Sequence, residues 1–302
     1  MLVRHMKTIA AESLRTRRSP LGLLAGGALA QFSRSQALNT ATAAAASPFA
    51  TPQAVHEGEV GTSSYRLFFQ HGDTGARMSP WHDIPTSAGG GLHHFVSEIP
   101  KYGTAKMEVS LSAAHNPIVQ DLTAATEGDT GGVPSLRHYH GPIYWNYGCM
   151  PQTWEDPTVV HPQLQYRGDN DPLDVVEIGS AALPCGAVTP VKVLGVLAMI
   201  DGGELDWKVI AVAASDPLAD SLHDIADVEA QLPGTVSGIR EWFRWYKVPS
   251  GKPLNAFGFD EQCMGRTEAL QVVSETHQHY LALRRGDRPF EGPVSLLALG
   301  DV

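Results

Sequence analysis

The stretch GDNDPLDVVEIG, residues 168–179, sets three aspartates directly before an apolar run of β type. Asp169, Asp171 and Asp174 fall within six residues, and like charges this close are costly unless a cation lies among them. In an extended chain Asp169 and Asp171 would point the same way, while Pro172 fixes the backbone where the loop enters the strand. Because Mg²⁺ prefers clustered carboxylate oxygens, the stretch predicts a metal site at the start of a buried strand.

Two other interpretations of this acidic stretch remain open. A calcium-binding EF-hand loop also begins Asp-x-Asp, but it needs glycine at the sixth position and glutamate at the twelfth. Asp174 and Ser180 occupy these positions, which disfavours an EF-hand. The other alternative is a solvated acidic turn that binds no ligand.

A second acidic pair lies at the turn between two apolar strands expected at 191–200 and 207–213. Asp201 and Asp206 bracket this turn. A hairpin here would place both carboxylates at one end of the sheet, on a loop of the kind that often carries functional sites. Such a pair is common by itself, but beside the stretch at 168–174 it strengthens the prediction of a metal site.

Cationic and phenolic side chains accompany the acids, and these are Lys106, Tyr147, Lys208, Tyr246 and Lys247. Glu108 shares one strand face with Lys106, a pattern that also occurs as a simple surface ion pair. Either tyrosine could equally be a core aromatic. Taken together, the groups indicate metal-assisted attack of water on a phosphoryl group, in which bound cations lower the pKa of the water and hold the leaving oxygens.

These segments resemble the signature of the soluble, family I inorganic pyrophosphatases, and in particular their eukaryotic branch. The likeness centres on Asp169–Val175 and covers roughly Ser64 to Leu283. The other matching segments are Glu98-Ile99-Pro100, Ala105-Lys106-Met107-Glu108, Asn146-Tyr147-Gly148, Pro151-Gln152-Thr153-Trp154-Glu155-Asp156-Pro157, Asp206-Trp207-Lys208, and Glu241-Trp242-Phe243-Arg244 with Tyr246-Lys247. The resemblance implies hydrolysis of pyrophosphate to two phosphates, a homodimer, and a five-stranded OB-like barrel with flanking C-terminal helices.

The resemblance also implies three or four Mg²⁺ ions per active site, with Mn²⁺ or Zn²⁺ as substitutes. By position, the residues that match metal ligands are Asp169, Asp174, Asp201, Asp206 and Glu108. Asp174 bridges two ions in this assignment. Asp171 matches the carboxylate that hydrogen-bonds the nucleophilic water and acts as general base, with Tyr147 and Lys106 as the other catalytic groups.

The same resemblance implies which residues bind the substrate. The residues matching those that hold the phosphates are Lys106, Tyr147, Lys208, Tyr246 and Lys247, and Glu98 matches an acid that lines the cavity. The family carries a phosphate-binding arginine before the Asn-Tyr-Gly turn, and Arg137 is the candidate here. The segment from Arg137 to Asn146 is shorter than the family pattern.

Short β-type runs precede helical spacing along the chain. Strands are expected at 64–70, 94–99, 105–111, 175–178, 191–200 and 207–213, and helices at 235–246 and 267–283. This order predicts an α+β fold, mainly β, built on a small closed sheet. We expect a single domain over residues 57–300, with a surface loop at 123–135.

Residues 1–50 carry six basic residues and one acid, although the whole chain of 302 residues has a formal charge of −10. A base-rich, acid-poor start is typical of an organelle presequence. Residues 1–50 are therefore expected to be a targeting presequence and linker that is disordered or cleaved. We expect the mitochondrial matrix, with the plastid as the alternative and the cytoplasm third. A tail without a targeting role is the other interpretation.

The acidic balance argues against nucleic acid as a partner, and no apolar stretch long enough for a membrane span is present in the sequence. The three cysteines cannot make a disulfide framework.

Two alternatives to an active pyrophosphatase stay open. One is a catalytically silent scaffold with the same fold, and the other is a metal-dependent phosphatase of organic phosphates. A Gly-x₄-Gly-Lys-Ser/Thr nucleotide loop is absent from the sequence, which disfavours the second.

Overall fold

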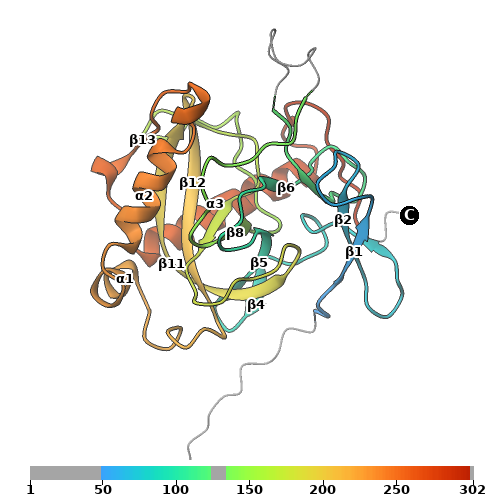
Figure 1. Cartoon of the computed structure of the whole chain (residues 1–302), viewed down its shortest axis with the longest axis horizontal. Coiled ribbons are helices and arrows are strands. Elements are labelled where there is room, and N and C mark those ends of the chain that lie inside the picture. The colour runs from blue at the N-terminus through green and yellow to red at the C-terminus, as the bar shows by residue number, and fades with distance from the viewer. Residues whose placement is uncertain (1–48, 124–133, 300–302) are drawn as a thin grey trace, which may run out of the picture. The chain divides into compact units, whose positions relative to one another are not determined.

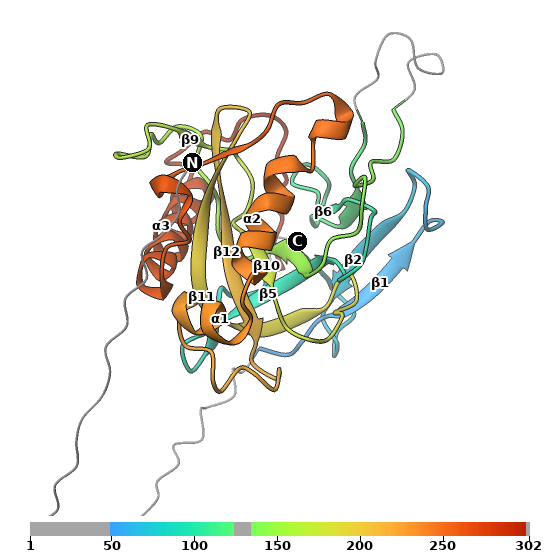
Figure 2. The same cartoon turned by 60° about the vertical axis from the view of Figure 1, so that its left-hand side comes forward.

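Two long strands, β11 (Val188–Asp201) and β12 (Glu204–Ala213), form a hairpin with a helix on each face (Figure 1). The computed structural model describes residues 49–123 and 134–299. Side chains alternate along β11, so that Leu197 and Met199 join one apolar cluster while Val196 and Ala198 join another. The first cluster includes α2 (Thr235–Trp245) and the second includes α3 (Arg266–Arg284). Figure 2 shows the two helices on opposite sides of the hairpin.

The hairpin belongs to a large mixed sheet with the strand order β13-β11-β12-β10-β8-β5-β4, and β9 pairs with β12. The remaining strands are β4 (Ser87–Gly89), β5 (Leu92–Ile99), β8 (Asn146–Cys149), β9 (Arg167–Gly168), β10 (Asp174–Glu177) and β13 (Ala256–Phe257). Strand β10 is parallel to β12 and antiparallel to β8. An additional pairing joins β5 to β11, with Val96 opposite Val188.

A second, smaller sheet has the order β1-β2-β7-β6, and β3 pairs with β2. Its strands are β1 (Gln53–Glu57), β2 (Arg66–Gln70), β3 (Arg77–Met78), β6 (Met107–Val109) and β7 (Ile118–Gln120). Its inner side chains, such as Leu67 and Ile118, share a buried cluster with Trp81 and Trp154. This packing ties the small sheet to the loop that follows β8.

The helical part comes late in the chain, as the sequence predicted. Helices α2 and α3 coincide with the expected spans to within two residues. A short helix, α1 (Ile225–Gln231), was not expected, although Asp224 and Asp227 give it a complete capping box. Two single-turn 3₁₀ helices cover Val248–Ser250 and Phe259–Glu261. The architecture is therefore a sheet-rich α+β fold, which confirms the predicted fold class.

Two predictions fall largely or partly beyond the described residues. The presequence expected at 1–50 reaches them only at its last two positions, and most of the loop expected at 123–135 lies outside them. Across 49–123 and 134–299, no helix combines the length and the apolar character that crossing a bilayer would require.

Candidate active site

Strand register brings the first catalytic candidates together. Asp174, the first residue of β10, lies opposite Lys208 on the parallel strand β12. On the other side of β10, Val176 lies opposite Tyr147 of β8. Diagonal neighbours across strands are within reach of long side chains, and the Tyr147 hydroxyl donates a hydrogen bond to Asp174 Oδ2. Residues distant in sequence thus meet on one face of the large sheet.

Lys208 lies between two of the predicted metal ligands. Its Nζ donates to carboxylate oxygens of Asp174 and Asp206 and lies 3.0 Å from the Tyr147 hydroxyl. Only 2% of the side chain is exposed. Burial would lower the pKa of Lys208, but the charges of Asp174 and Asp206 outweigh burial and hold the pKa well above its usual value. The ammonium group is therefore a fixed positive charge inside the acidic cluster.

Three carboxylates, one of them paired with Lys208, converge beside this ammonium group. Glu155, Asp169 and Asp206 each offer an oxygen, and these oxygens lie within 4.8 Å of one another. Glu155 Oε1 accepts a hydrogen bond from the Trp207 backbone N–H at 3.0 Å, whereas its Oε2 is buried and lacks a hydrogen-bond partner in the described residues. Burial and then the neighbouring acids raise the pKa of both Glu155 and Asp169 well above the ordinary range.

The loop that carries Asp169 and Asp171 is a turn, which corrects the expectation of an extended chain there. Asn170 between them is left-handed, with φ of 75°. The Asp171 backbone N–H donates to Asp169 Oδ1 at 3.0 Å, and Asn170 N–H donates to the Glu155 carbonyl at 2.9 Å. Asparagine tolerates this conformation better than most residues do. The turn consequently holds Asp169 against Glu155 and leaves Asp171 towards solvent.

Asp171 lies at the outer edge of the acidic cluster. Partial loss of solvent raises its pKa to about 7, with smaller contributions from the charges of Glu108 and Asp174. Asp206 also has a pKa of about 7, because burial raises the pKa more than Lys208 lowers it. Both carboxyl groups would therefore ionise fully at neutral pH only if more positive charge were added.

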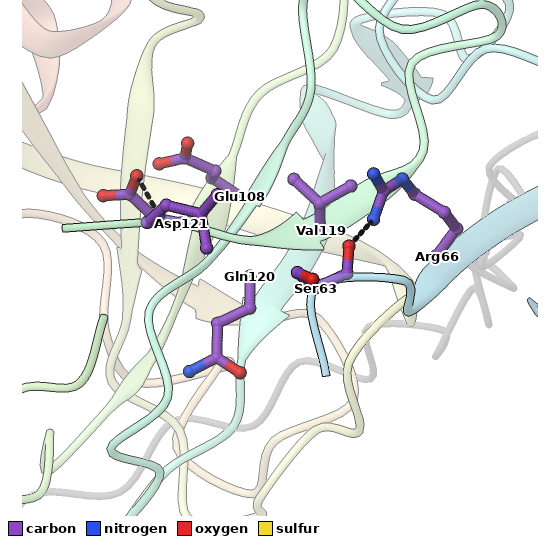
Figure 3. Close-up of a pocket in the computed structure, with 7 residues that line it drawn as sticks. Ser63, Arg66, Glu108, Val119, Gln120 and Asp121 are labelled. Carbon is purple, nitrogen blue, oxygen red and sulfur yellow. Dashed lines mark hydrogen bonds between the residues drawn. The ribbon is translucent and has the colours of Figure 1, made fainter. Parts of the chain in front are cut away.

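Lys106 and Arg137 share one carboxylate. Asp121 Oδ2 lies 3.0 Å from Lys106 Nζ and 2.8 Å from Arg137 Nη1, and Lys106 Nζ also contacts Glu108. Glu108 and Asp121 lie towards one side of a pocket, while Arg66 lies beyond Val119 in Figure 3. The remaining residues that line this pocket are Ser63, Gln120 and Leu122.

A third set of contacts lies at the tip of the long hairpin. Asp201 Oδ2 accepts a hydrogen bond from the Tyr246 hydroxyl at 3.0 Å and pairs with Lys247. Tyr246 is the C-cap of α2, so this helix end brings both residues to the hairpin. Burial and then the Asp201 charge raise the pKa of Tyr246 well above its usual value.

Glu98 lies deeper, and its Oε1 accepts from the Val109 backbone N–H at 2.7 Å. Burial, and next the charge of Asp174, raise the pKa of Glu98 well above its usual value. The pKa of Asp206 also responds to the charge of Asp201, and that of Asp171 responds to Asp206. The carboxyl groups of Glu98, Asp171, Asp174, Asp201 and Asp206 therefore lie close enough to influence one another's charge.

Three residues of this site were not assigned a role from the sequence. Glu155 lies in the segment 151–157, which was quoted only for its resemblance. Asp121 is not part of a sequence motif. It comes next to Lys106 only because β6 pairs with β7. Tyr139 is buried, and its pKa, raised by burial, responds to the charges of Lys106 and Lys208.

The donor set fits hard divalent cations. Mg²⁺ takes carboxylate oxygens, and Glu155 offers a buried oxygen that has no hydrogen-bond partner within residues 49–123 and 134–299, beside two further carboxylates. The mutual repulsion of these groups would fall when a cation bound. Basic and phenolic donors surround the carboxylates, so the site can hold cations and an anion with several negative charges.

Comparisons with known proteins agree with this geometry. Residues 95–281 match the family described as inorganic pyrophosphatase. Soluble inorganic pyrophosphatase 1, chloroplastic, of Chlamydomonas reinhardtii is 47% identical over 241 residues, which are 80% of this chain and 82% of that protein.

Solved structures give the same result. A type I inorganic pyrophosphatase from Toxoplasma gondii is 48% identical with a TM-score of 0.71, covering 77% of this chain and 99% of that chain. An N-terminally truncated vacuolar soluble pyrophosphatase from Trypanosoma cruzi, solved in complex with PPi, is 41% identical with a TM-score of 0.70, covering 79% and 94%. The resemblance predicted from the sequence is confirmed, and this chain belongs to the inorganic pyrophosphatase family.

Proposed function

We propose that the chain hydrolyses inorganic pyrophosphate to two phosphates. The observation that carries this proposal is the convergence of carboxylates: Asp174 and Asp206 meet the buried Lys208, and Asp206 also lies beside Glu155 and Asp169. Further cations and phenols lie nearby, such as Lys247 and Tyr246 at Asp201. Pyrophosphate is a compact polyanion, and its hydrolysis needs positive charge arranged around both phosphoryl groups. A relative in the family has been solved with PPi bound.

The cofactor is proposed to be Mg²⁺, three or four ions per site, with Mn²⁺ or Zn²⁺ as substitutes. The residues that would hold the ions are Asp169, Asp174, Asp201, Asp206 and Glu108, together with Glu155. Bound Mg²⁺ would lower the pKa of water and neutralise phosphate charge. The orphaned Oε2 of Glu155 and the raised pKa values of its neighbours support this assignment.

The chain's own residues would accept the proton and bind the phosphates. The Asp171 carboxylate accepts a proton from the attacking water, since it lies at the open edge of the cluster. Lys208 and Tyr147 donate to the phosphate oxygens from within. The donors at the rim are Lys106, Arg137, Tyr246 and Lys247, and Glu98 lines the cavity below them.

The deciding experiment measures phosphate release by the purified full chain from pyrophosphate with Mg²⁺, and in parallel from ATP and a simple phosphate monoester. We expect rapid release from pyrophosphate alone. Release from none of the three would identify a catalytically silent scaffold. Preferred release from ATP or the monoester would identify a phosphatase of organic phosphates, and either result would refute the proposal.

We also propose that β5, β8, β10, β12 and β11 form a closed five-stranded barrel of OB type. Each strand pairs with the next, and the β5–β11 pairing returns to the start, which supports closure. A homodimer is expected from the resemblance, and sedimentation velocity would test it.

For localisation we propose an organelle, the mitochondrial matrix first and the plastid second. The base-rich residues 1–50 and a relative named chloroplastic support an organelle. A fluorescent fusion of the full chain, compared with one lacking residues 1–50, would distinguish these compartments from the cytoplasm.

A further inference from the structure

The chain that follows α3, here called the tail (residues 286–299), lies beyond the region 95–281 that matches the family. It nevertheless contacts two of the segments that carry metal-ligand candidates. Those segments are 154–158, which contains Glu155, and 169–171, which contains Asp169. The tail therefore contacts the surroundings of two of the three clustered carboxylates.

The first contact is made with the left-handed turn. Asn170 Nδ2 donates a hydrogen bond to the Glu291 carbonyl at 2.9 Å. The same side chain accepts from Trp154 Nε1 at Oδ1, at 3.2 Å. The Asn170 amide thus links the tail to the indole of the neighbouring segment and leaves neither end of the amide unpaired.

The second contact is aromatic. The Phe290 ring stacks on Trp154, with ring centroids 6.0 Å apart and planes inclined by 26°, and it also meets Trp81 at 6.2 Å. Trp154 is completely buried. Since the Trp154 indole bonds to both the backbone and the side chain of Asn170, Phe290 holds in place the group that supports the turn.

The third contact is polar. Arg288 Nη1 donates to Thr158 Oγ1 at 3.2 Å, and Arg288 Nε lies 3.7 Å from Asp156 Oδ2. The Asp156 side chain is inaccessible to solvent, so this guanidinium supplies a nearby positive charge for a buried carboxylate. Asp156 directly follows Glu155 in the chain.

The far end of the tail is also anchored. Ser295 N–H donates to the Leu111 carbonyl at 2.7 Å, and the Ser295 carbonyl accepts from Asn116 Nδ2 at 3.2 Å. Leu299 N–H donates to Asp83 Oδ1 at 2.8 Å. The tail is thus held by α3 at one end and by these hydrogen bonds at the other.

We propose that the tail positions Glu155 and Asp169 for metal binding, and that Phe290 and Asn170 are the positioning residues. The Glu155 and Asp169 carboxylates repel each other when no cation is present. The tail contacts the segment that carries each of them, 154–158 and 169–171. The proposal rests on the proposed function for its biological meaning, but the contacts predict a property that can be measured without substrate. That property is the affinity for a divalent ion.

The test compares Phe290→Ala with the unaltered chain by calorimetric titration with Mn²⁺ in the absence of pyrophosphate. We expect the dissociation constant to rise about 10-fold, as is usual when a group that orients a metal ligand is lost. The Mg²⁺ concentration for half-maximal hydrolysis should rise by a similar factor, while kcat at saturating Mg²⁺ changes less than about twofold.

Two variants separate positioning from general stability. Leu296→Ala removes apolar packing from the same cluster as Phe290, and we expect it to lower the melting temperature without changing Mn²⁺ affinity. Phe290→Tyr keeps the stacked ring and should retain the original affinity. Equal Mn²⁺ affinities in Phe290→Ala and Leu296→Ala would overturn the proposal.

Asn170→Gly provides a second test in case Phe290→Ala does not fold. Glycine allows the left-handed turn but removes the amide that bonds to Glu291, so Mn²⁺ affinity should again fall. Unchanged affinity in this variant would contradict the proposal. Failure of the unaltered chain to hydrolyse pyrophosphate would refute the proposed function instead, and it would leave the Mn²⁺ comparison valid.

Discussion

Lys208 supplies the internal positive charge that makes the acidic cluster tolerable when no cation is bound. Its ammonium group contacts Asp174 and Asp206, and its side chain passes near the rings of Tyr147 and Phe243, with Nζ 5.5 and 5.3 Å from their centroids. A charge this buried is stabilised only by its partners. In the proposed function the same lysine also donates to a phosphate, so one residue would serve both stability and substrate binding.

Replacing this lysine should therefore affect folding and activity together. Lys208→Met leaves the buried Asp206 and the half-buried Asp174 without their cation, and we expect the metal-free protein to lose about 3–5 kcal/mol of unfolding free energy. Urea denaturation with and without Mg²⁺ measures this loss, and Mg²⁺ should recover part of it. Lys252→Met, at an exposed lysine, is the control and should be neutral. A Lys208→Met protein as stable as the control would contradict this account.

Asp171 gives a second prediction at this scale. Asp171→Asn keeps the size of the side chain but cannot accept the proton, so we expect kcat to fall about 100-fold or more. The pH optimum should rise, because hydroxide must then form without the base. A pH–rate profile checks both effects, with Asp220→Asn at an exposed aspartate as the control. Full activity with an unchanged profile would remove the assigned role.

At the scale of elements, the sequence predicted what local pattern can encode. Continuous apolar runs identified β11 and β12, and helical spacing identified α2 and α3. Strand β8 was quoted only as a motif, because its four residues are too short and too polar to show a β pattern. Its place between β5 and β10 depends on long-range pairing.

The site residues also divide into those that a local sequence pattern predicts and those that depend on long-range strand pairing. Asp169, Asp174 and Asp206 could be predicted because they cluster in the sequence or flank a hairpin. Asp121 could not be, since it joins Lys106 only through the pairing of β6 with β7. The turn at Asn170 was also missed, because two-residue spacing alone does not reveal a left-handed residue.

Close approach of β8 to β5 gives a prediction for these elements. A Cβ at Gly148 would lie 2.0 Å from the Val96 carbonyl oxygen, which is part of the neighbouring backbone. We expect Gly148→Ala to cost about 1–3 kcal/mol of unfolding free energy and to impair activity, because Tyr147 is the adjacent residue. Urea denaturation measures the cost. Gly238→Ala in α2, where nothing lies within 4 Å, should be neutral or stabilising, and equal stability of the two variants would refute the clash.

At the scale of the whole molecule, the acids couple stability to pH. Asp171 and Asp206 have pKa values of about 7 in the folded chain, compared with about 3.9 for an unperturbed aspartate. Between these values the folded state binds more protons than the unfolded state does. Its stability therefore falls as pH rises through this window.

The expected result is a melting temperature of the metal-free protein that decreases from pH 5 to pH 7.5. Mg²⁺ replaces the protons, so it should stabilise the protein more at pH 7.5 than at pH 5. Saturation at 100 times the dissociation constant would add about 2.7 kcal/mol. Thermal melts with EDTA or Mg²⁺ at both pH values measure this. The same Mg²⁺ effect at both values would contradict the assignment.

The side chains of the site come from positions between Glu98 and Lys247, and no shorter part of the polypeptide contains them all. Lys247 and Tyr246 arrive only with the end of α2, long after the acidic stretch has left the ribosome. All the proposed cation ligands are in the chain by Asp206. Because a preformed cation site is rare in an unfolded chain, the proposed cage would assemble only when these ligands fold together, and the proposed phosphate donors Tyr246 and Lys247 would be synthesised after all of them.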